Sequence, residues 1–299
     1  MAEPIHDQAE GLRRLLVQNF LNVLTITSGG TGTGKTTTVI SLAAALARSG
    51  KHVLVIDENA GANNVSATLG ISAHRDLLDV IRRDKTLDEV IIPGPGGFFI
   101  LPAGRGMRVL GKLSAADQAH VISCFAQLAQ PIDVILIDAA PGRSSQMLTL
   151  AHSIHEIVVV VSPEPASITA AYALIKHTCS HHQDKQHFHV MVNKAGTETQ
   201  AKMIFDNMAD VARRHLSVSL DFMGFVPQDG KLCLGRRVTG AIPATASAAA
   251  FSRIAESLAD WPCPDDEETG LERFMECLLL SSQNNSADAA VTATAAGAR

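Results

Sequence analysis

The sequence predicts an α/β protein with a doubly wound, mostly parallel sheet that carries helices on both faces. The first observation is a series of short, β-branched apolar runs: VLTIT, HVLVID, FFILPA, DVILID, EIVVVVS, HVMVN and FMGFV. Runs that rarely alternate with polar residues are typical of strands buried on both faces of a parallel sheet. The second observation is that helical patterns lie between them, such as 114–130 and 167–180, each opening on a serine suited to an N-cap. This alternation favours one doubly wound domain.

That domain is expected to cover residues 20–262, and two segments flank it. Residues 1–19 contain a short amphipathic helix pattern, DQAEGLRRLLVQ. After the break WPCPDDEET, residues 263–280 resume a helical pattern with one apolar stripe. Residues 281–299 are mostly small, and we expect them to be disordered because they cannot bury enough apolar surface.

Composition narrows the class of protein. No stretch approaches the ~20 apolar residues of a membrane span, and the N-terminus is no signal peptide, so we expect a cytoplasmic protein. The five cysteines form no C-x-x-C pair, which favours free thiols over disulfides or a zinc site. A net charge of −5 argues against a broad nucleic-acid surface. The histidine-rich stretch 177–189 fits no known ligand spacing, so a solvated loop is favoured there over a metal site.

The stretch SGGTGTGKTTT, residues 28–38, predicts a phosphate-binding loop. It reads G-x-x-x-x-G-K-T, follows an apolar strand pattern and opens into an Ala/Leu-rich helix pattern, which is the context this motif requires. Glycines let backbone N–H groups point at phosphates, and the helix N-terminus adds positive potential. Lys35 is expected to neutralise the β- and γ-phosphates, and the Thr36 hydroxyl to bind Mg²⁺. The residues expected to contact the nucleotide are Gly30, Thr31, Gly32, Thr33, Gly34, Lys35, Thr36 and Thr37.

Polar residues end three other predicted strands. Asp57 ends HVLVID, Asp138 ends DVILID, and Asn193 ends HVMVN. Ligands of open α/β sheets bind at the carboxyl ends of strands, so a shared ligand explains these residues better than unrelated helix caps. In the D-x-x-x-G pattern that starts at Asp138, the carboxylate is expected to hold a magnesium-bound water, and Gly142 to sense the γ-phosphate. The Asn193 amide is a candidate for the adenine edge.

These motifs carry a family resemblance. The P-loop, the I-D-x-x-x-G-x-x-N run at 56–64, the D-x-x-x-G at 138 and GFVPQD at 224–229 resemble the MinD/ParA-type ATPases. DQAEGLRRLL, NNVSATLG, SPEPASITAAYALIK and FDNMADVARRHL resemble segments of the flagellar number regulators, the FlhG/FleN family, so that the resemblance spans roughly residues 6–280. It implies a P-loop fold of the MinD type, ATP and Mg²⁺ as cofactors, and a homodimer that forms around ATP. It also adds Pro227 and Asp229 to the nucleotide site.

The chain departs from the family pattern at two positions. The family has a lysine that reaches across the dimer to the partner's phosphates, and Gly30 occupies that position here, followed by Thr31 in place of a glycine. The family's water-activating acid is Asn59 in this chain, and an amide cannot take a proton from water. The implied catalytic residues are therefore Lys35, Asp57, Asn59 and Asp138, in a slow ATPase. Arg143 is a candidate substitute cation, although a plain surface role is favoured for it.

The two flanking helices are candidate interaction segments. By resemblance, Asp7, Gln8, Leu12 and Arg13 dock on the partner GTPase FlhF and stimulate its GTP hydrolysis. The C-terminal stripe is expected to attach the ATP dimer peripherally to the inner face of the membrane, and to fold back on its own domain in the monomer. Only Arg273 offsets Glu272 and Glu276 in this helix, so attraction to anionic lipid is weak, and self-packing remains the alternative. The stripe consists of Leu271, Phe274, Met275, Leu278 and Leu279.

The leading interpretation is thus a MinD-like ATP switch that regulates flagellar number and placement. Further candidate partners are a flagellar transcription regulator and components of the C-ring. One alternative is a regulator that binds nucleotide without hydrolysing it, which Gly30 and Asn59 favour. Another is a ParA-type ATPase that positions DNA or cargo, against which the lack of a Lys/Arg cluster argues. A nitrogenase-like reductase is disfavoured, because no cysteine pair is placed to hold a shared iron–sulfur cluster.

Overall fold

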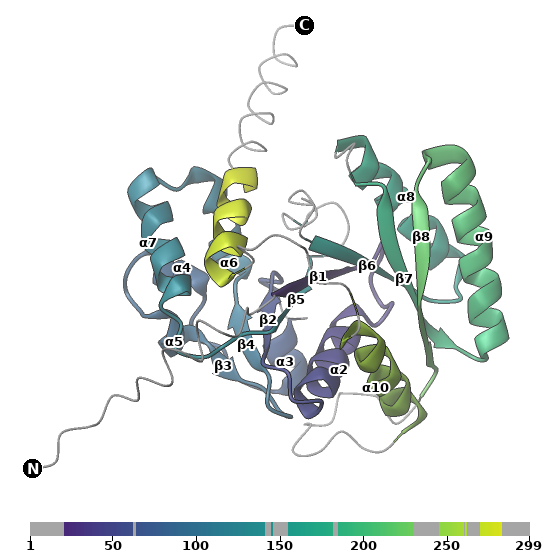
Figure 1. The fold of residues 1–299 in the computed structure, drawn as a ribbon, viewed down its shortest axis with the longest axis horizontal. Coiled ribbons are helices and arrows are strands. Elements are labelled where there is room, and N and C mark those ends of the chain that lie inside the picture. Colours follow the sequence, from purple (N-terminus) through teal and green to yellow (C-terminus); the bar gives the residue numbers. More distant parts are fainter. Residues whose placement is uncertain are drawn as a thin grey trace, which may run out of the picture.

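A computed structural model describes residues 21–61, 64–140, 145, 155–181, 185–229, 245–259, 261 and 270–282. Its centre is an eight-stranded sheet with the order β3-β4-β2-β5-β1-β6-β7-β8 (Figure 1). The strands are β1 (Asn22–Thr27), β2 (Val53–Asp57), β3 (Ile92–Pro93), β4 (Phe99–Pro102), β5 (Val134–Asp138), β6 (His155–Val161), β7 (His187–Ala195) and β8 (Ser219–Pro227). The residues expected to form the N-terminal helix, 1–19, lie outside the described part.

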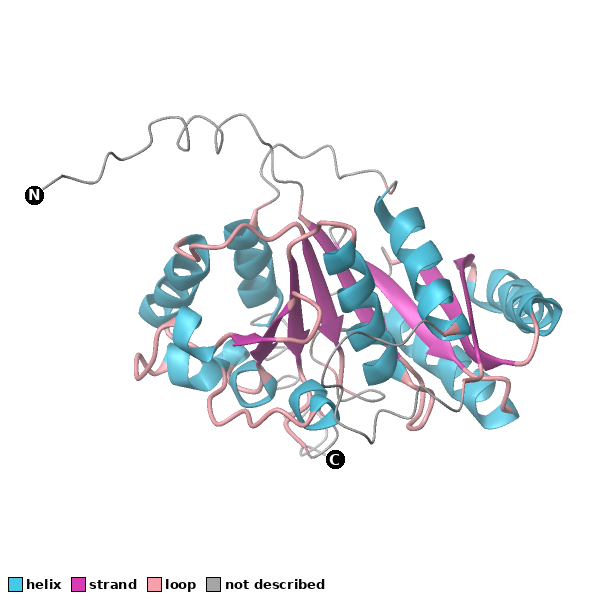
Figure 2. Cartoon of the chain, turned by 90° about the horizontal axis from the view of Figure 1, so that it is seen from below, coloured by secondary structure: helices cyan, strands magenta, loops and turns pink. Residues whose placement is uncertain are grey.

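Helices connect the strands and cover both faces of the sheet (Figure 2). They are α2 (Lys35–Arg48), α3 (Val65–Leu69), α4 (Leu77–Ile81), α5 (Leu87–Val90), α6 (Gly104–Met107), the 3₁₀ helix η1 (Leu110–Lys112), α7 (Ala115–Ala126), α8 (Pro165–His181), α9 (Glu198–Leu216) and α10 (Ala246–Ala259). Residues 271–282 form a further helix, called here the C-terminal helix. The predicted doubly wound α/β fold is confirmed.

Neighbouring strands are parallel except at one edge, where β3 runs antiparallel to β4. The sequence analysis missed β3, which is only two residues long and ends in Pro93. Proline has no N–H to donate to a ladder, so an edge position suits it. β2 and β5 are buried along their whole length, which explains why their sequences are continuous apolar runs.

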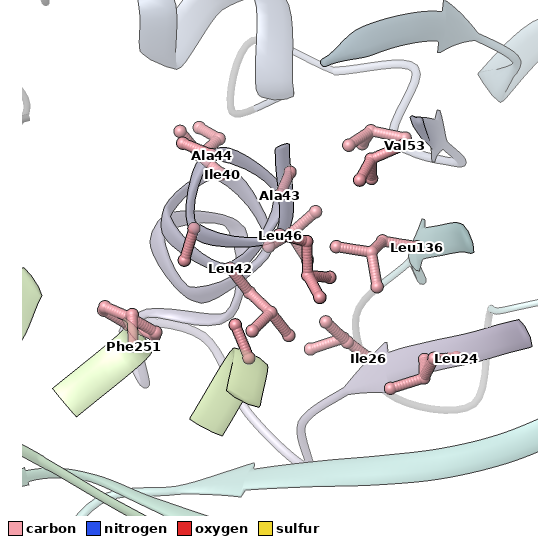
Figure 3. Packing of buried hydrophobic residues seen from close by; sticks show 14 of the residues in the cluster. Leu24, Ile26, Ile40, Leu42, Ala43, Ala44, Leu46, Val53, Leu136 and Phe251 are labelled. Atoms are coloured by element: carbon pink, nitrogen blue, oxygen red, sulfur yellow. The ribbon is translucent and has the colours of Figure 1, made fainter. Parts of the chain in front are cut away.

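Alternate residues of each central strand contribute to different cores. Leu24 and Ile26 of β1 belong to one buried cluster with residues of α2 and α10, among them Leu42, Leu46 and Phe251 (Figure 3). The opposite face of the sheet is covered by α4 to α7 on one half and by α8 and α9 on the other. Helix α2 thus lies directly on the strand that leads into the P-loop, which anchors the loop from both ends.

The C-terminal helix packs into the same domain, beside α4, α6 and α7 (yellow in Figure 1). Phe274, Met275, Leu278 and Leu279 are at most 2% exposed, in one cluster with residues of β1, β2 and β5. Leu271 packs at the rim of that cluster. The expectation that the stripe folds back on its own domain is therefore confirmed. No helix in the part of the chain that the structure describes has the length and apolar content needed to cross a membrane.

One expected helix start is wrong. The serine at the start of 114–130 caps α7 as expected, since Ser114 accepts a hydrogen bond from the Asp117 N–H. Helix α8, however, begins at Pro165 rather than after Ser167. Proline suits the first helical position because its missing N–H has no partner there anyway. The Ser167 hydroxyl instead accepts a 2.9 Å bond from the Ser162 N–H and joins the end of β6 to the helix.

Candidate nucleotide-binding site

The predicted site residues after β1 and at the ends of β2 and β5 meet at the carboxyl ends of these strands. These three strands are neighbours, and Asp138 lies in register with Ile26 of β1 and with Asp57 of β2. The carboxyl ends of parallel strands share an edge, so the P-loop that follows β1 faces both carboxylates. On either side of β1 the chain winds in opposite directions across the sheet, which is where open α/β sheets bind their ligands.

Two glycines of the P-loop are required by the space around them. Gly34 precedes α2 with φ +89°, and a Cβ there would lie 2.3 Å from Nδ2 of Asn193. A Cβ on Gly29 would lie 2.1 Å from the backbone carbon of Ala170 in α8. A left-handed φ also disfavours any residue with a side chain at Gly34. The motif glycines therefore allow the loop to pass between α8 and Asn193.

Gly30 differs from these two. Its φ lies outside the left-handed region, and the nearest atom to a Cβ built on it is Ala170 Cβ at 4.0 Å. A side chain thus fits at this position without backbone strain. The absence of a lysine at residue 30 is a chemical difference and not one that the fold imposes.

Lys35 and Thr36 both bind Asp138 in this structure. The Lys35 ammonium forms an ion pair with Oδ1, and the Thr36 hydroxyl donates a 2.8 Å hydrogen bond to Oδ2. Asp138 is fully buried, and burial raises the pKa of this carboxyl above its ordinary value, while Lys35 opposes the rise. The three residues expected to handle phosphate and Mg²⁺ are therefore in contact at the start of α2.

Asn59 bridges the two carboxylates. Its Nδ2 donates to Asp57 Oδ1 at 3.0 Å and to Asp138 Oδ2 at 3.0 Å. The backbone N–H groups of Asn59 and Val65 also donate to Asp57, at 3.0 and 2.6 Å. Burial and the charge of Asp138 raise the pKa of Asp57 to about 7, although these donors lower it. An aspartate at residue 59 has no donors to place between the two carboxylates, so the amide has a definite structural role.

The remaining nucleotide candidates bind either the loop or α10. The Asn193 amide donates 2.8 Å to the Thr33 carbonyl, so in this structure it holds the P-loop, and its expected adenine contact stays a prediction. The Ser247 hydroxyl of α10 lies 3.3 Å from the Pro227 carbonyl and 3.2 Å from Asp229 Oδ2, which ties this segment to the helix. Within the loop, Thr33 is buried, Thr31 and Gly32 are exposed, and Thr36 and Thr37 are half-buried.

Two residues at the site were missed by the sequence analysis. The Lys194 ammonium donates 2.6 Å to the Gly32 carbonyl, and its backbone is left-handed with φ 60°. Glu58 Oε2 accepts 2.7 Å bonds from the Ala140 N–H and from the Ser145 hydroxyl. The available signals were a lysine directly after the predicted strand pattern HVMVN, which ends in Asn193, and a second acid directly after Asp57.

Several predicted residues lie outside the described part of the chain. They are Asp7, Gln8, Leu12 and Arg13 of the N-terminal segment, and Gly142 and Arg143 after β5.

Comparison with known proteins agrees with this geometry. Residues 24–235 match the family model described as the CobQ/CobB/MinD/ParA nucleotide binding domain. The chain is 33% identical to the antiactivator FleN of Pseudomonas aeruginosa over 271 residues, which cover 89% of this chain and 96% of FleN. It is 24% identical to the flagellum site-determining protein YlxH of Helicobacter pylori over 210 residues, 70% of each chain.

Solved structures show the same fold. A chain of the MinC:MinD cell division complex of Aquifex aeolicus aligns with a TM-score of 0.60 and 25% identity, covering 82% of this chain and 98% of that one. The septum site-determining protein MinD of Pyrococcus horikoshii, complexed with Mg-ADP, aligns with a TM-score of 0.55 and 20% identity, covering 80% and 96%. With its P-loop, its strand order and the match over residues 24–235, the chain belongs to the CobQ/CobB/MinD/ParA family of nucleotide-binding proteins and is a relative of the antiactivator FleN.

Proposed function

We propose that this chain is a MinD-like ATP switch that regulates the number and placement of flagella. In this proposal it binds ATP and Mg²⁺, dimerises, attaches to the inner face of the membrane and stimulates the partner GTPase FlhF. Its similarity to FleN along 89% of its length supports the flagellar role. The observation that carries the nucleotide role is the contact of Lys35 and Thr36 with Asp138 at the start of α2.

That contact supplies the groups for binding Mg-ATP. In the nucleotide complex Lys35 would neutralise the β- and γ-phosphates, and the Thr36 hydroxyl would bind the magnesium ion. Asp138, once its ion pair with Lys35 is broken, would hold a magnesium-bound water. The ion would supply positive charge that favours the ionised carboxylates of Asp57 and Asp138 in a buried place. Binding is therefore expected to bring a change of partners around Asp138.

Hydrolysis is proposed to be slow. Gly30 presents no cation to a partner subunit, and Asn59 orients a water molecule without accepting its proton. The test is ATP turnover of the full chain, with and without lipid vesicles and FlhF. A basal rate that rises with vesicles or FlhF supports the switch. Bound ATP that stays intact under every condition supports the hydrolysis-deficient regulator instead.

The N-terminal segment is proposed to act on FlhF. Asp7, Gln8, Leu12 and Arg13 would dock on this GTPase, where an arginine or glutamine supplied in trans stabilises the charge that develops during GTP hydrolysis. The measurement is GTP turnover by FlhF in the presence of this chain. Gln8→Ala or Arg13→Ala should abolish stimulation, whereas Arg14→Ala is the matched control. Full stimulation by both test variants would remove this part of the proposal.

Membrane attachment is proposed to depend on dimerisation. The four buried residues of the stripe would cost about 1.5–3 kcal/mol each to expose, so roughly 6–12 kcal/mol together. Insertion into lipid restores apolar burial, but a helix with so little positive charge adds little electrostatic attraction to anionic lipid. Two helices presented by one ATP dimer bind better, because the second attachment is intramolecular. Release of the C-terminal helix is thus expected to accompany the dimer.

Hydrogen exchange tests the release directly. Amides of 271–282 should exchange slowly in the ADP-bound monomer and faster once a non-hydrolysable ATP analogue and anionic vesicles are added. In parallel, Phe274→Glu should lower the stability of the monomer by roughly 3–5 kcal/mol. Leu280→Glu, at a side chain that is 59% exposed, should change it little. Vesicle binding that persists while exchange of the helix stays slow would assign the stripe to the core alone.

A further inference from the structure

A cluster of imidazole and carboxylate groups lies near the amino ends of β7 and β8, whereas the P-loop lies at the carboxyl end of β1. His187 and His189 are two residues apart near the start of β7, so they point to the same face of the sheet. Asp221 of β8 pairs with His189 across the ladder. One ligand atom from each of these three residues lies within 4.8 Å of the other two. The topology thus gathers part of the histidine-rich stretch that the nucleotide site leaves unused.

The contacts within the cluster are polar. His187 Nε2 lies 3.2 Å from Asp221 Oδ2, and His189 Nε2 lies 3.2 Å from Glu156 Oε2 on β6. The two imidazole rings meet edge to face with their centroids 4.9 Å apart. His187 and Asp221 are open to solvent, with side chains 42% and 58% exposed, whereas the side chain of His189 is 11% exposed. An ion from solvent therefore reaches the cluster from the side of His187 and Asp221.

We propose that His187, His189 and Asp221 bind a divalent transition-metal ion, with Zn²⁺ as the ion that fits this ligand set. Zn²⁺ takes imidazole nitrogens and carboxylate oxygens at about 2.0–2.2 Å, so two ligand atoms of a tetrahedral site stand about 3.3–3.5 Å apart. The 3.2 Å between His187 Nε2 and Asp221 Oδ2 is already close to that spacing. Rotation of these two exposed side chains closes the remaining gap to His189, and a fourth position stays open to water.

Glu156 has a supporting role in this site. Its bond to one ring nitrogen of His189 leaves the other nitrogen for the metal, and carboxylates commonly orient metal-binding histidines in this way. Lys185, 4.0 Å from Glu156, balances that carboxylate. The two negative charges and one ammonium leave the cluster with a net negative charge that suits a dication when the imidazoles are neutral.

Two ordinary histidine–carboxylate ion pairs would explain the individual distances. Such pairs need one carboxylate per imidazole and no convergence of three ligand atoms, whereas here the three groups face one another. Trp261 restricts His189 further, since its ring lies over the imidazole with centroids 4.2 Å apart. A ligand held in one orientation loses less entropy on binding, which favours a site over a chance meeting of surface groups.

The same tryptophan provides a reporter, because Trp261 is the single tryptophan of the chain. The tag-free full-length protein, stripped of metal and saturated with Mg-ADP, is titrated with ZnCl₂ by calorimetry and with NiCl₂ by fluorescence. We expect one Zn²⁺ per chain, and quenching of Trp261 by Ni²⁺ with the same stoichiometry. His187→Ala and Asp221→Asn should each weaken Zn²⁺ binding by at least roughly tenfold. Both substitutions are at exposed side chains, so the fold should persist, and unchanged Mg-ADP affinity checks this.

Two other variants are the controls. His181 on α8 stacks on His177 with centroids 4.2 Å apart, and His120 on α7 lies 3.6 Å from the Cys124 sulfur. Both pairs are alternative places for zinc. His181→Ala and His120→Ala should leave Zn²⁺ affinity and Ni²⁺ quenching unchanged. Zn²⁺ binding that survives both His187→Ala and Asp221→Asn, or that is lost with either control, would overturn the proposal.

Discussion

The nucleotide site has two halves, the residues expected to bind the nucleotide and those proposed to support hydrolysis, and the two differ in how strongly the fold constrains them. In the binding half, Gly29 and Gly34 have no room for a Cβ, and Lys35 and Thr36 contact a buried carboxylate. In the proposed hydrolytic half, Gly30 has room for a side chain, and the Asn59 amide donates hydrogen bonds to the carboxylates of Asp57 and Asp138. Steric packing thus constrains the glycines of the first half, whereas in the second half Gly30 lacks that constraint and Asn59 is constrained by its hydrogen bonds.

The largest effect is expected in the binding half, from Lys35→Ala. A charge-assisted phosphate contact contributes about 1.5–3 kcal/mol, so nucleotide affinity should fall by roughly 10- to 100-fold or more. Calorimetric titration with Mg-ATP measures this, and Lys51→Ala, at an exposed residue just after α2, is the control. Equal affinities of Lys35→Ala and the wild type would mean that the loop is a structural turn.

The next largest effect separates two glycines of the same loop. Gly34→Ala forces φ +89° on a residue with a side chain and places its Cβ 2.3 Å from the Asn193 amide, so unfolding free energy should fall by about 2–4 kcal/mol. Gly30→Ala should change it by less than about 0.5 kcal/mol. Urea unfolding of both variants measures the difference. Similar losses in the two variants would show that the steric distinction between the halves is wrong.

Asn59→Asp is expected to change how the stability of the protein depends on pH. The pKa of Asp57 in the folded protein is about 7, above the ordinary value of 3.8. Protonation of Asp57 therefore stabilises the folded state fully below about pH 4, and this contribution to the unfolding free energy is lost as the pH rises through 7. A third carboxylate beside Asp57 and Asp138 should deepen that loss, by about 1–3 kcal/mol at pH 8 and less at pH 5. Urea unfolding of the nucleotide-free protein at both pH values measures this.

The control for that change is Asn64→Asp in the same loop. Asn64 caps α3 by accepting a hydrogen bond from the Ala67 N–H, and aspartate caps equally well. Its stability should therefore stay near that of the wild type at both pH values. A pH-independent loss in Asn59→Asp would mean that the amide does not separate the two carboxylates.

The smallest expected effect is a gain in the hydrolytic half from Gly30→Lys. The added lysine fits without strain and supplies the cation whose absence the proposed slow hydrolysis attributes to this position. ATP turnover or the dimer fraction with an ATP analogue should rise several-fold, while thermal stability stays unchanged. Turnover and dimerisation are followed by phosphate release and light scattering. If neither changes and the wild type is already fast, another cation already acts there, such as Lys194 of β7, whose ammonium donates to the Gly32 carbonyl of the P-loop.

Part of the site was predictable because its chemistry is local in sequence. The P-loop spacing, the acids at the strand ends and the expected Mg²⁺ ligand Thr36 all follow from short motifs next to apolar strand patterns. Lys194 and Glu58 were not predicted, because each acts through a contact with a residue far along the chain: Gly32 for the lysine, and Ala140 for the glutamate. The short strand β3 escaped prediction because two residues carry no periodicity.

The sequence by itself determined the doubly wound fold and the position of the phosphate loop, since hydrophobic periodicity and glycine spacing act over a few neighbouring residues. Only the tertiary structure decided which side chains far apart in the sequence lie close together. It set Asn59 between two carboxylates, placed Phe274 and Met275 in the core rather than on a surface, and gathered His187 and His189 with Asp221. These contacts depend on strand order and register, which arise from the packing of the whole sheet.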